Sequence, residues 1–218
     1  MKSRLCTLLE ILFLTLMLMR GLPASANNTY YFANIGLEEK LSQLSVLKIH
    51  EDYKGYIWFG TRNGLNRFDG NEMKVYKHQD DQEQNSLVDN HVTTIAESRS
   101  HNLWIGSLQG LTCIDLTTNR ITPYYANKHP LLNGGARALF ADVNGTLWVG
   151  TPNGLFYFSE KTKRKTTTIH QLKRLNGIAV SSLMESTKGE LWVGTDQNGV
   201  YRFDKKRRLV IHYTSQGS

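Results

Sequence analysis

One short sequence motif centred on a tryptophan recurs along the chain and restricts its possible folds more than any other feature. All four tryptophans of the 218-residue sequence have the same surroundings and are spaced 44 to 46 residues apart. They are Trp58, Trp104, Trp148 and Trp192. Each is followed two residues later by a glycine, at Gly60, Gly106, Gly150 and Gly194. A fixed period of this length indicates a repeat protein in which each repeat is one supersecondary unit.

The residues of each repeat are typical of β-strands. The apolar residues are mostly β-branched or aromatic, and they alternate over short runs between Gly, Asn and Asp. In the first repeat this pattern predicts strands at 46–50, 57–60, 65–68 and 73–76. Regular alternation would place Val46, Lys48 and His50 on one face of the first strand. The intervening turns contain Gly55, Asn63-Gly64 and Asp69-Gly70, which readily adopt the backbone of tight turns.

The predicted fold class is all-β, with four tandem four-stranded blades of a β-propeller. We expect the blades at 46–90, 91–135, 136–179 and 180–213, preceded by a lead-in strand within 27–45. A tryptophan in the middle of a strand of every repeat typically packs as a wedge between neighbouring blades. The four tryptophans and the four glycines that follow them are therefore predicted to be structural residues rather than ligand contacts.

The first 26 residues have the composition of a cleavable signal peptide. Lys2 and Arg4 precede an apolar run at 11–19, and Ala24-Ser25-Ala26 supplies the small residues that a signal peptidase recognises. The apolar run is shorter than the roughly 20 residues that span a bilayer. We therefore expect residues 1–26 to be removed on export. Removal would leave Cys113 as the single cysteine, so an internal disulfide is not expected.

The segment from Asp52 to Gly70 resembles the two-component regulator propeller repeat. That pattern joins an Asp-x-x-Gly turn, an aliphatic-Trp-aliphatic-Gly-Thr strand and Gly-Leu-Asn-Arg-aromatic-Asp, and the likeness extends over about residues 30 to 213. The resemblance implies a periplasmic sensor of a hybrid two-component system, with carbohydrate sensing as its role. Such sensors usually have seven-bladed propellers that lead to a histidine kinase. Four blades and no kinase sequence suggest a truncated reading frame or a fragment.

The sequence offers no recognisable catalytic set. Its seven histidines are scattered, without the short spacing of a zinc site. The Asp-x-x-Gly turns are one residue longer than the Asp-boxes of sialidases, and the spacing from glycine to tryptophan is one residue shorter than in quinoprotein repeats. We therefore expect no enzyme activity, no metal and no cofactor. Two alternatives stay open: an exported propeller that serves protein–protein contacts, and a propeller enzyme such as a glycosidase.

Ligand contacts are expected at one end of the blades. Because strand direction alternates, the turn between the second and third strands lies at the same end as the long connections to the next blade, 77–90 and 126–135. Function concentrates on longer loops carried by a rigid scaffold. The candidate residues have planar amides or a guanidinium, which suit sugar hydroxyls. They are Arg62, Asn63, Gln109, Asn153, Gln197 and Asn198.

The chain is basic, with a formal net charge of +7. Two basic runs, 161–165 and 205–208, suit an acidic polysaccharide or a lipid headgroup, although both fall in turns where solvated charge is common. Nucleic acid is not expected to meet an exported protein. The expected partners are an oligo- or polysaccharide, further propeller blades or a second copy of the chain, and a membrane only through segments beyond this sequence.

Overall fold

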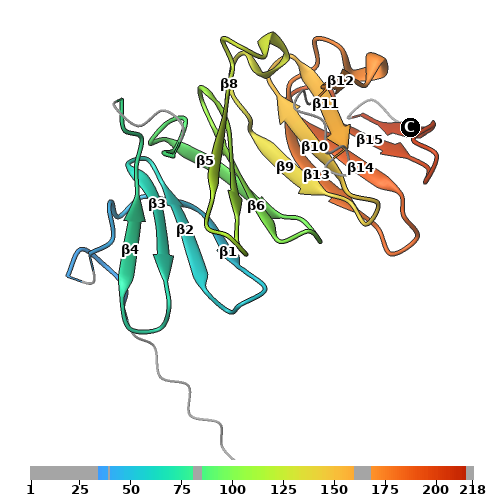
Figure 1. Cartoon of the computed structure of the whole chain (residues 1–218). Coiled ribbons are helices and arrows are strands. Elements are labelled where there is room, and N and C mark those ends of the chain that lie inside the picture. The colour runs from blue at the N-terminus through green and yellow to red at the C-terminus, as the bar shows by residue number, and fades with distance from the viewer. Residues whose placement is uncertain (1–33, 39, 81–84, 160–167, 215–218) are drawn as a thin grey trace, which may run out of the picture. The chain divides into compact units, whose positions relative to one another are not determined.

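The computed structural model describes residues 34–38, 40–80, 85–159 and 168–214, and within them the chain forms four antiparallel sheets of four strands each (Figure 1). In every sheet the strands lie side by side in chain order, as in a meander. Each sheet is one blade, so the structure has the all-β blade architecture that the repeat predicts. The expected signal peptide at 1–26 lies outside the described residues.

The blades follow the tryptophan repeat closely. Blade 1 consists of β1 (Val46–Glu51), β2 (Ile57–Thr61), β3 (Gly64–Phe68) and β4 (Met73–Tyr76). Blade 2 consists of β5 (Val92–Glu97), β6 (Asn102–Ser107), β7 (Gly110–Asp115) and β8 (Ile121–Tyr125). Blade 3 consists of β9 (Ala138–Ala141), β10 (Thr146–Thr151), β11 (Gly154–Ser159) and β12 (His170–Gln171). Blade 4 consists of β13 (Val180–Glu185), β14 (Leu191–Thr195), β15 (Val200–Phe203) and β16 (Leu209–Tyr213). Two 3-10 turns, η1 (Pro130–Leu132) and η2 (Lys173–Leu175), lie in the connections between blades.

The turn between the first two strands is tied to the tryptophan of the next strand. Asp52 accepts backbone hydrogen bonds from Lys54 and Tyr56, at 2.9 and 3.1 Å. Its other oxygen accepts the indole N–H of Trp58 at 2.8 Å. Gly55 closes the turn with φ +83°, a conformation that glycine adopts without strain. The buried carboxylate therefore satisfies three donors at once.

Neighbouring blades pack through two different faces. The tryptophan face of a blade carries the tryptophan and the glycine two residues after it, as Trp58 and Gly60 do in blade 1. The aliphatic face is the opposite side and carries the residues that flank the tryptophan, as Leu103 and Ile105 do in blade 2. Each of the three buried apolar clusters joins the tryptophan face of one blade to the aliphatic face of the next.

The glycine after the tryptophan is needed for close approach between blades. A Cβ on Gly60 would lie 2.6 Å from the side chain of Val92, the first residue of blade 2. A Cβ on Gly150 would lie 2.6 Å from Val180, the first residue of blade 4. Contacts this short are not tolerated, so a side chain at either position would push the blades apart.

The alternation expected for the first strand is wrong at its start, because a β-bulge interrupts the strand there. The register of β1 on β2 shifts between Val46 and Lys48, so Val46 does not share the face of Lys48. The same shift occurs between Val92 and Thr94, and between Val180 and Ser182. The bulge turns the opening valine toward the glycine of the preceding blade, where Val92 and Val180 are fully buried. Side-chain alternation alone does not reveal this extra residue.

The expected lead-in strand is wrong over the part of 27–45 that the structure describes. Residues 34–38 and 40–45 form turns and bends. Lys40 bonds to the carbonyl of Leu37, and the backbone N–H of Ser42 bonds to the Asn66 side chain at 2.8 Å instead of to a strand. The backbone donor is thus satisfied by a side chain, and no ladder is required.

A tryptophan-to-alanine change at a blade interface tests whether these residues hold the blades together. We expect Trp148→Ala to lower the free energy of unfolding by about 3–5 kcal/mol, because it opens a cavity in a buried cluster. Urea denaturation followed by circular dichroism measures this value. The control Leu108→Ala, at a half-exposed turn residue, should change it by less than about 0.5 kcal/mol. Equal effects of the two changes would contradict the wedge role.

Candidate functional site

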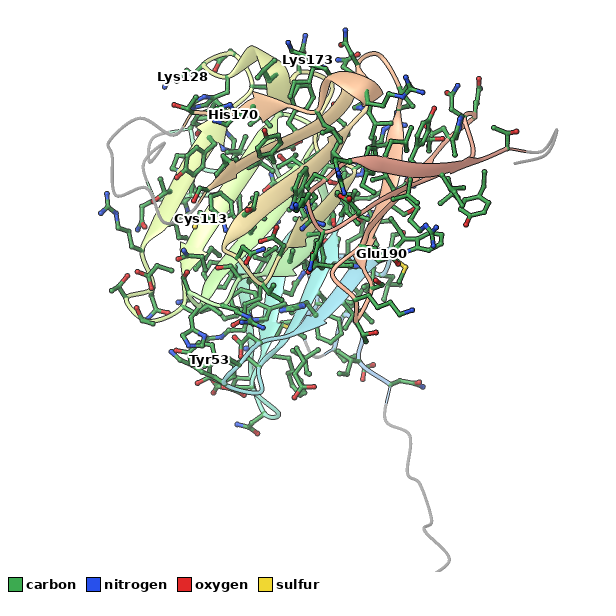
Figure 2. The ribbon with its side chains drawn as sticks, turned by 90° about the vertical axis from the view of Figure 1, so that its right-hand side faces the viewer. Tyr53, Cys113, Lys128, His170, Lys173 and Glu190 are labelled. Atoms are coloured by element: carbon green, nitrogen blue, oxygen red, sulfur yellow. The ribbon has the colours of Figure 1, made fainter. Side chains whose placement is uncertain are left out.

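All six candidate ligand residues lie in the turns between second and third strands, and all six side chains are exposed. The long connections between blades meet these turns directly. Gly64 N–H bonds to the carbonyl of Asn90, and Ala126 N–H bonds to that of Gln109. Figure 2 shows Lys128 and Lys173, from two connections, at one end of the blades and Tyr53, from the β1–β2 turn, at the other. We call the former the connection end.

Three of the candidates, all asparagines, also shape their own turns. The backbone N–H of Asn63 bonds to the Thr61 hydroxyl at 3.0 Å, and its amide lies 3.4 Å from the carbonyl of Ser42. Asn153 repeats this arrangement, with its amide 3.1 Å from the carbonyl of Asn133. The backbone N–H of Asn198 bonds to the Thr195 hydroxyl. These contacts give the asparagines a structural role whether or not a ligand binds.

A cavity of about 210 Å³ opens at the connection end of blade 2. Only Gln109 among the six candidates lines it, while Asn153 reaches its rim through the bond to Asn133. Arg62 and Gln197 lie in other turns and do not line this cavity. The remaining lining residues are Leu108, Tyr125, Ala126, Asn127 and Asn133.

The cavity combines amides with one aromatic ring. Gln109, Asn127 and Asn133 provide donors and acceptors of the kind that hydroxyl groups match. Tyr125 provides an apolar ring, with the Lys128 ammonium 5.3 Å from its centroid. The sequence analysis missed Tyr125 and Asn127, although Tyr125 borders the connection at 126–135 and Asn127 lies within it. The length of the connection predicted that ligand contacts lie near it, but only the fold of the loop decides which of its side chains face the cavity.

A second cavity, of about 360 Å³, lies between blades 3 and 4. Arg207 on the β15–β16 turn crosses the interface there. Its guanidinium donates to Asp142 at 3.0 Å and to Glu185 at 2.7 Å, and lies 5.1 Å from the Trp148 ring. Arg208 pairs with Asp204 at 2.7 Å. Arg207 and Arg208 are therefore paired with nearby carboxylates. The other two residues of the basic run 205–208, Lys205 and Lys206, face solvent at this cavity. The other run, 161–165, lies outside the described residues.

The carboxyl group of Asp142 is held in its ionised form by its donors. Burial opposes ionisation and by itself would raise the pKa of Asp142. Hydrogen bonds from the Trp148 indole, from the backbone of Thr146 and Asn144, and from Arg207 outweigh burial, so the pKa lies below its ordinary value. The ionised carboxylate therefore contributes to the stability of the folded state.

Acidification tests this contribution. A lowered pKa in the folded state means that the stabilisation is complete above the pKa of the unfolded chain, about 4. It is lost as pH falls through the folded-state pKa, because the unfolded state then binds more protons. We expect the unfolding free energy of the wild type to fall more steeply below about pH 5 than that of Asp142→Asn. Urea titrations across this range measure both, and parallel curves would contradict the assignment.

The described part of the chain holds no group of three or more His, Cys, Asp and Glu side chains that would bind a metal ion. Within the same residues, no helix is long and apolar enough to cross a membrane. The six residues that line the connection-end cavity include no carboxylate. The geometry at that cavity therefore suits binding through hydrogen bonds and ring contacts.

Comparison with known proteins finds a family match in two segments of the chain. Residues 40–63 and 86–109 match the family model of the two component regulator propeller. A stretch of 52 residues is 42% identical to a protein named histidine kinase P4 from Formosa agariphila, and covers 24% of this chain and 4% of that protein. The chain thus spans only a small part of this curated relative.

Solved structures share the blade architecture. One described as the extracellular domain of a hybrid two component system from B. thetaiotaomicron is 22% identical with a TM-score of 0.61, over 76% of this chain and 24% of that one. A streptogramin B lyase is 16% identical with a TM-score of 0.59, over 80% of this chain and 56% of that one. The chain therefore spans about a quarter of the first structure. At these identities the likeness establishes the propeller fold alone. Whether the chain is a sensor or an enzyme has to be argued from the residues of the site.

Proposed function

We propose that this chain, which carries two-component regulator propeller repeats, is a ligand-binding segment of an extracytoplasmic two-component sensor, and that its ligand is a carbohydrate. The family match at 40–63 and 86–109 supports the signalling role. A solved structure described as the extracellular domain of a hybrid two component system has the same blade fold. Export through cleavage near Ala26 into the periplasm belongs to the same proposal and rests on the composition of residues 1–26.

The observation that carries the proposal is the cavity at the connection end of blade 2. It places the amides of Gln109 and Asn127 beside the ring of Tyr125. Sugars expose hydroxyl groups at their edges and C–H groups on their faces. An amide donates and accepts at the same time, and an aromatic ring covers an apolar face. The cavity thus offers both kinds of contact within about 210 Å³, enough for a short segment of an oligosaccharide.

The same lining supports binding without turnover as part of the proposal. Glycoside hydrolysis generally uses a pair of carboxylic acids on either side of the bond that is cleaved. The residues that line the connection-end cavity are amides, a tyrosine, alanine and leucine. A sugar held there would meet neither a general acid nor a nucleophilic carboxylate. The proposed role is therefore recognition, with the signal passed on by other parts of a sensor.

Two substitutions at this cavity test the carbohydrate proposal. A panel of neutral and acidic oligosaccharides is first screened by the shift of the thermal unfolding midpoint, because a ligand that binds only the folded state raises stability. For the glycan that binds, we expect Gln109→Ala and Tyr125→Ala each to weaken affinity about three- to tenfold in calorimetry, as one lost hydrogen bond or ring contact would.

The matched control is Asn71→Ala, which removes an exposed amide from the β3–β4 turn at the other end of the blades. It should leave the affinity unchanged. An equal loss in Asn71→Ala would place the site elsewhere. A panel without any ligand that shifts the midpoint would argue against a carbohydrate at this cavity, and hydrolysis of any glycan would argue for an enzyme.

A further inference from the structure

The cavity of about 360 Å³ between blades 3 and 4, which we call the interblade cavity, has two unlike walls. Blade 3 supplies a largely apolar wall, in which the rings of Trp148 and Tyr157 lie 4.8 Å apart and Leu172 adds an aliphatic side chain. Blade 4 supplies the turn between β15 and β16, where Lys205 and Lys206 are exposed. The two walls belong to one interface between neighbouring blades.

The space is present because two side chains of the repeat are short in blade 3. The counterparts of Asn144 and Thr146 in blade 1 are Lys54 and Tyr56. Lys54 reaches blade 2 and donates to the carbonyl of Leu116, and Tyr56 packs against the buried cluster between blades 1 and 2. Longer side chains therefore occupy the corresponding part of the first interface. Between blades 3 and 4 an amide and a hydroxyl line a cavity instead.

The charge that faces the interblade cavity is positive. Asp142 is the one carboxylate among its described lining residues, and it already accepts hydrogen bonds from Trp148 and Arg207. Lys205 and Lys206 take part in none of the ion pairs among the described residues. Their two ammonium groups are the donors that an anion in this cavity would meet.

These walls suit a ligand with two different sides. The C–H groups of a sugar ring make apolar contact with aromatic and aliphatic side chains. A carboxylate or a sulfate ester on the same ring accepts charge-assisted hydrogen bonds from ammonium groups. Asn144 and Thr146 provide donors and acceptors for hydroxyl groups. A small inorganic anion would use the two lysines and leave the blade 3 wall without a partner.

We propose that the interblade cavity binds an acidic sugar ring, with Lys205 and Lys206 holding its carboxylate or sulfate ester and the blade 3 wall contacting the ring. The cavity is formed by the β9–β10 and β15–β16 turns, away from the connection end. It adds a requirement for negative charge, because the residues that line the connection-end cavity are uncharged. The inference does not rest on binding at the connection end.

Calorimetry on the full chain with three defined sugars tests the proposal. The sugars are trigalacturonate, which carries carboxylates, neocarrabiose 4-sulfate, which carries a sulfate ester, and the neutral galactotriose. We expect an acidic sugar to bind more tightly than galactotriose, with an affinity that falls about fivefold between roughly 20 and 200 mM salt, because salt screens exposed charges. The tighter of the two acidic sugars identifies the substituent. Failure of both to bind would overturn the proposal.

Removing the two ammonium groups tests their role. The double variant Lys205→Gln and Lys206→Gln should weaken the affinity for the acidic sugar about tenfold, as the loss of a charge-assisted hydrogen bond would. The matched control Lys74→Gln and Lys77→Gln makes the same change of charge at two exposed lysines of blade 1. It should leave the affinity within about twofold of the wild type. Equal losses in the two double variants would mean unspecific attraction and would overturn the site.

Filling the cavity without a change of charge separates a built site from a charged surface. Thr146→Tyr introduces the residue that blade 1 has at this position and should weaken the acidic sugar more than about tenfold. The control Thr118→Tyr, at an exposed threonine of the β7–β8 turn, should bind as the wild type does. Circular dichroism shows that each variant is folded. An affinity that Thr146→Tyr leaves unchanged would contradict binding in the cavity, whatever happens at the connection end.

Discussion

The contact between a glycine on one blade and a valine on the next is the constraint on which the rest of the structure depends. Gly60 and Gly150 allow Val92 and Val180 to approach so closely that no other residue would fit. This approach lets the tryptophans pack into the neighbouring blade, and the Asp52 or Asp142 carboxylate then fixes the indole from the turn. Packing, hydrogen bonding and turn geometry thus act on the same side chain.

Neighbouring blades pack through their faces, so the connections at their ends can differ in length and sequence. The connections at one end differ in length and include the 3-10 turns η1 and η2. Even so, each connection contributes a buried leucine just before the next blade, at Leu87, Leu132 and Leu175, and Leu41 is a buried leucine just before blade 1. The leucine anchors the loop, and the residues on either side of it stay available to form a cavity such as the one at Gln109.

Strands and turns were predictable because their signals are local. Alternation and Asn-Gly or Asp-Gly turns located all four strands of blade 1 to within one residue at each end. The bulges after Val92 and Val180 were not predictable, because they place each valine against a glycine on another blade. At the cavity, hairpin position identified Gln109, but Tyr125 and Asn127 were missed because no periodicity describes an irregular connection.

The sequence by itself determined the repeat, the strand order within each blade and the residue types on the two blade faces. Each of these depends on residues that are close in the chain, where backbone preference and side-chain alternation act. Tertiary structure decided which turns and connections meet, that Arg207 bridges Asp142 and Glu185, and that Thr146 and Lys206 line the same cavity. These features depend on contacts between residues from different repeats, and such contacts exist only once the blades have packed.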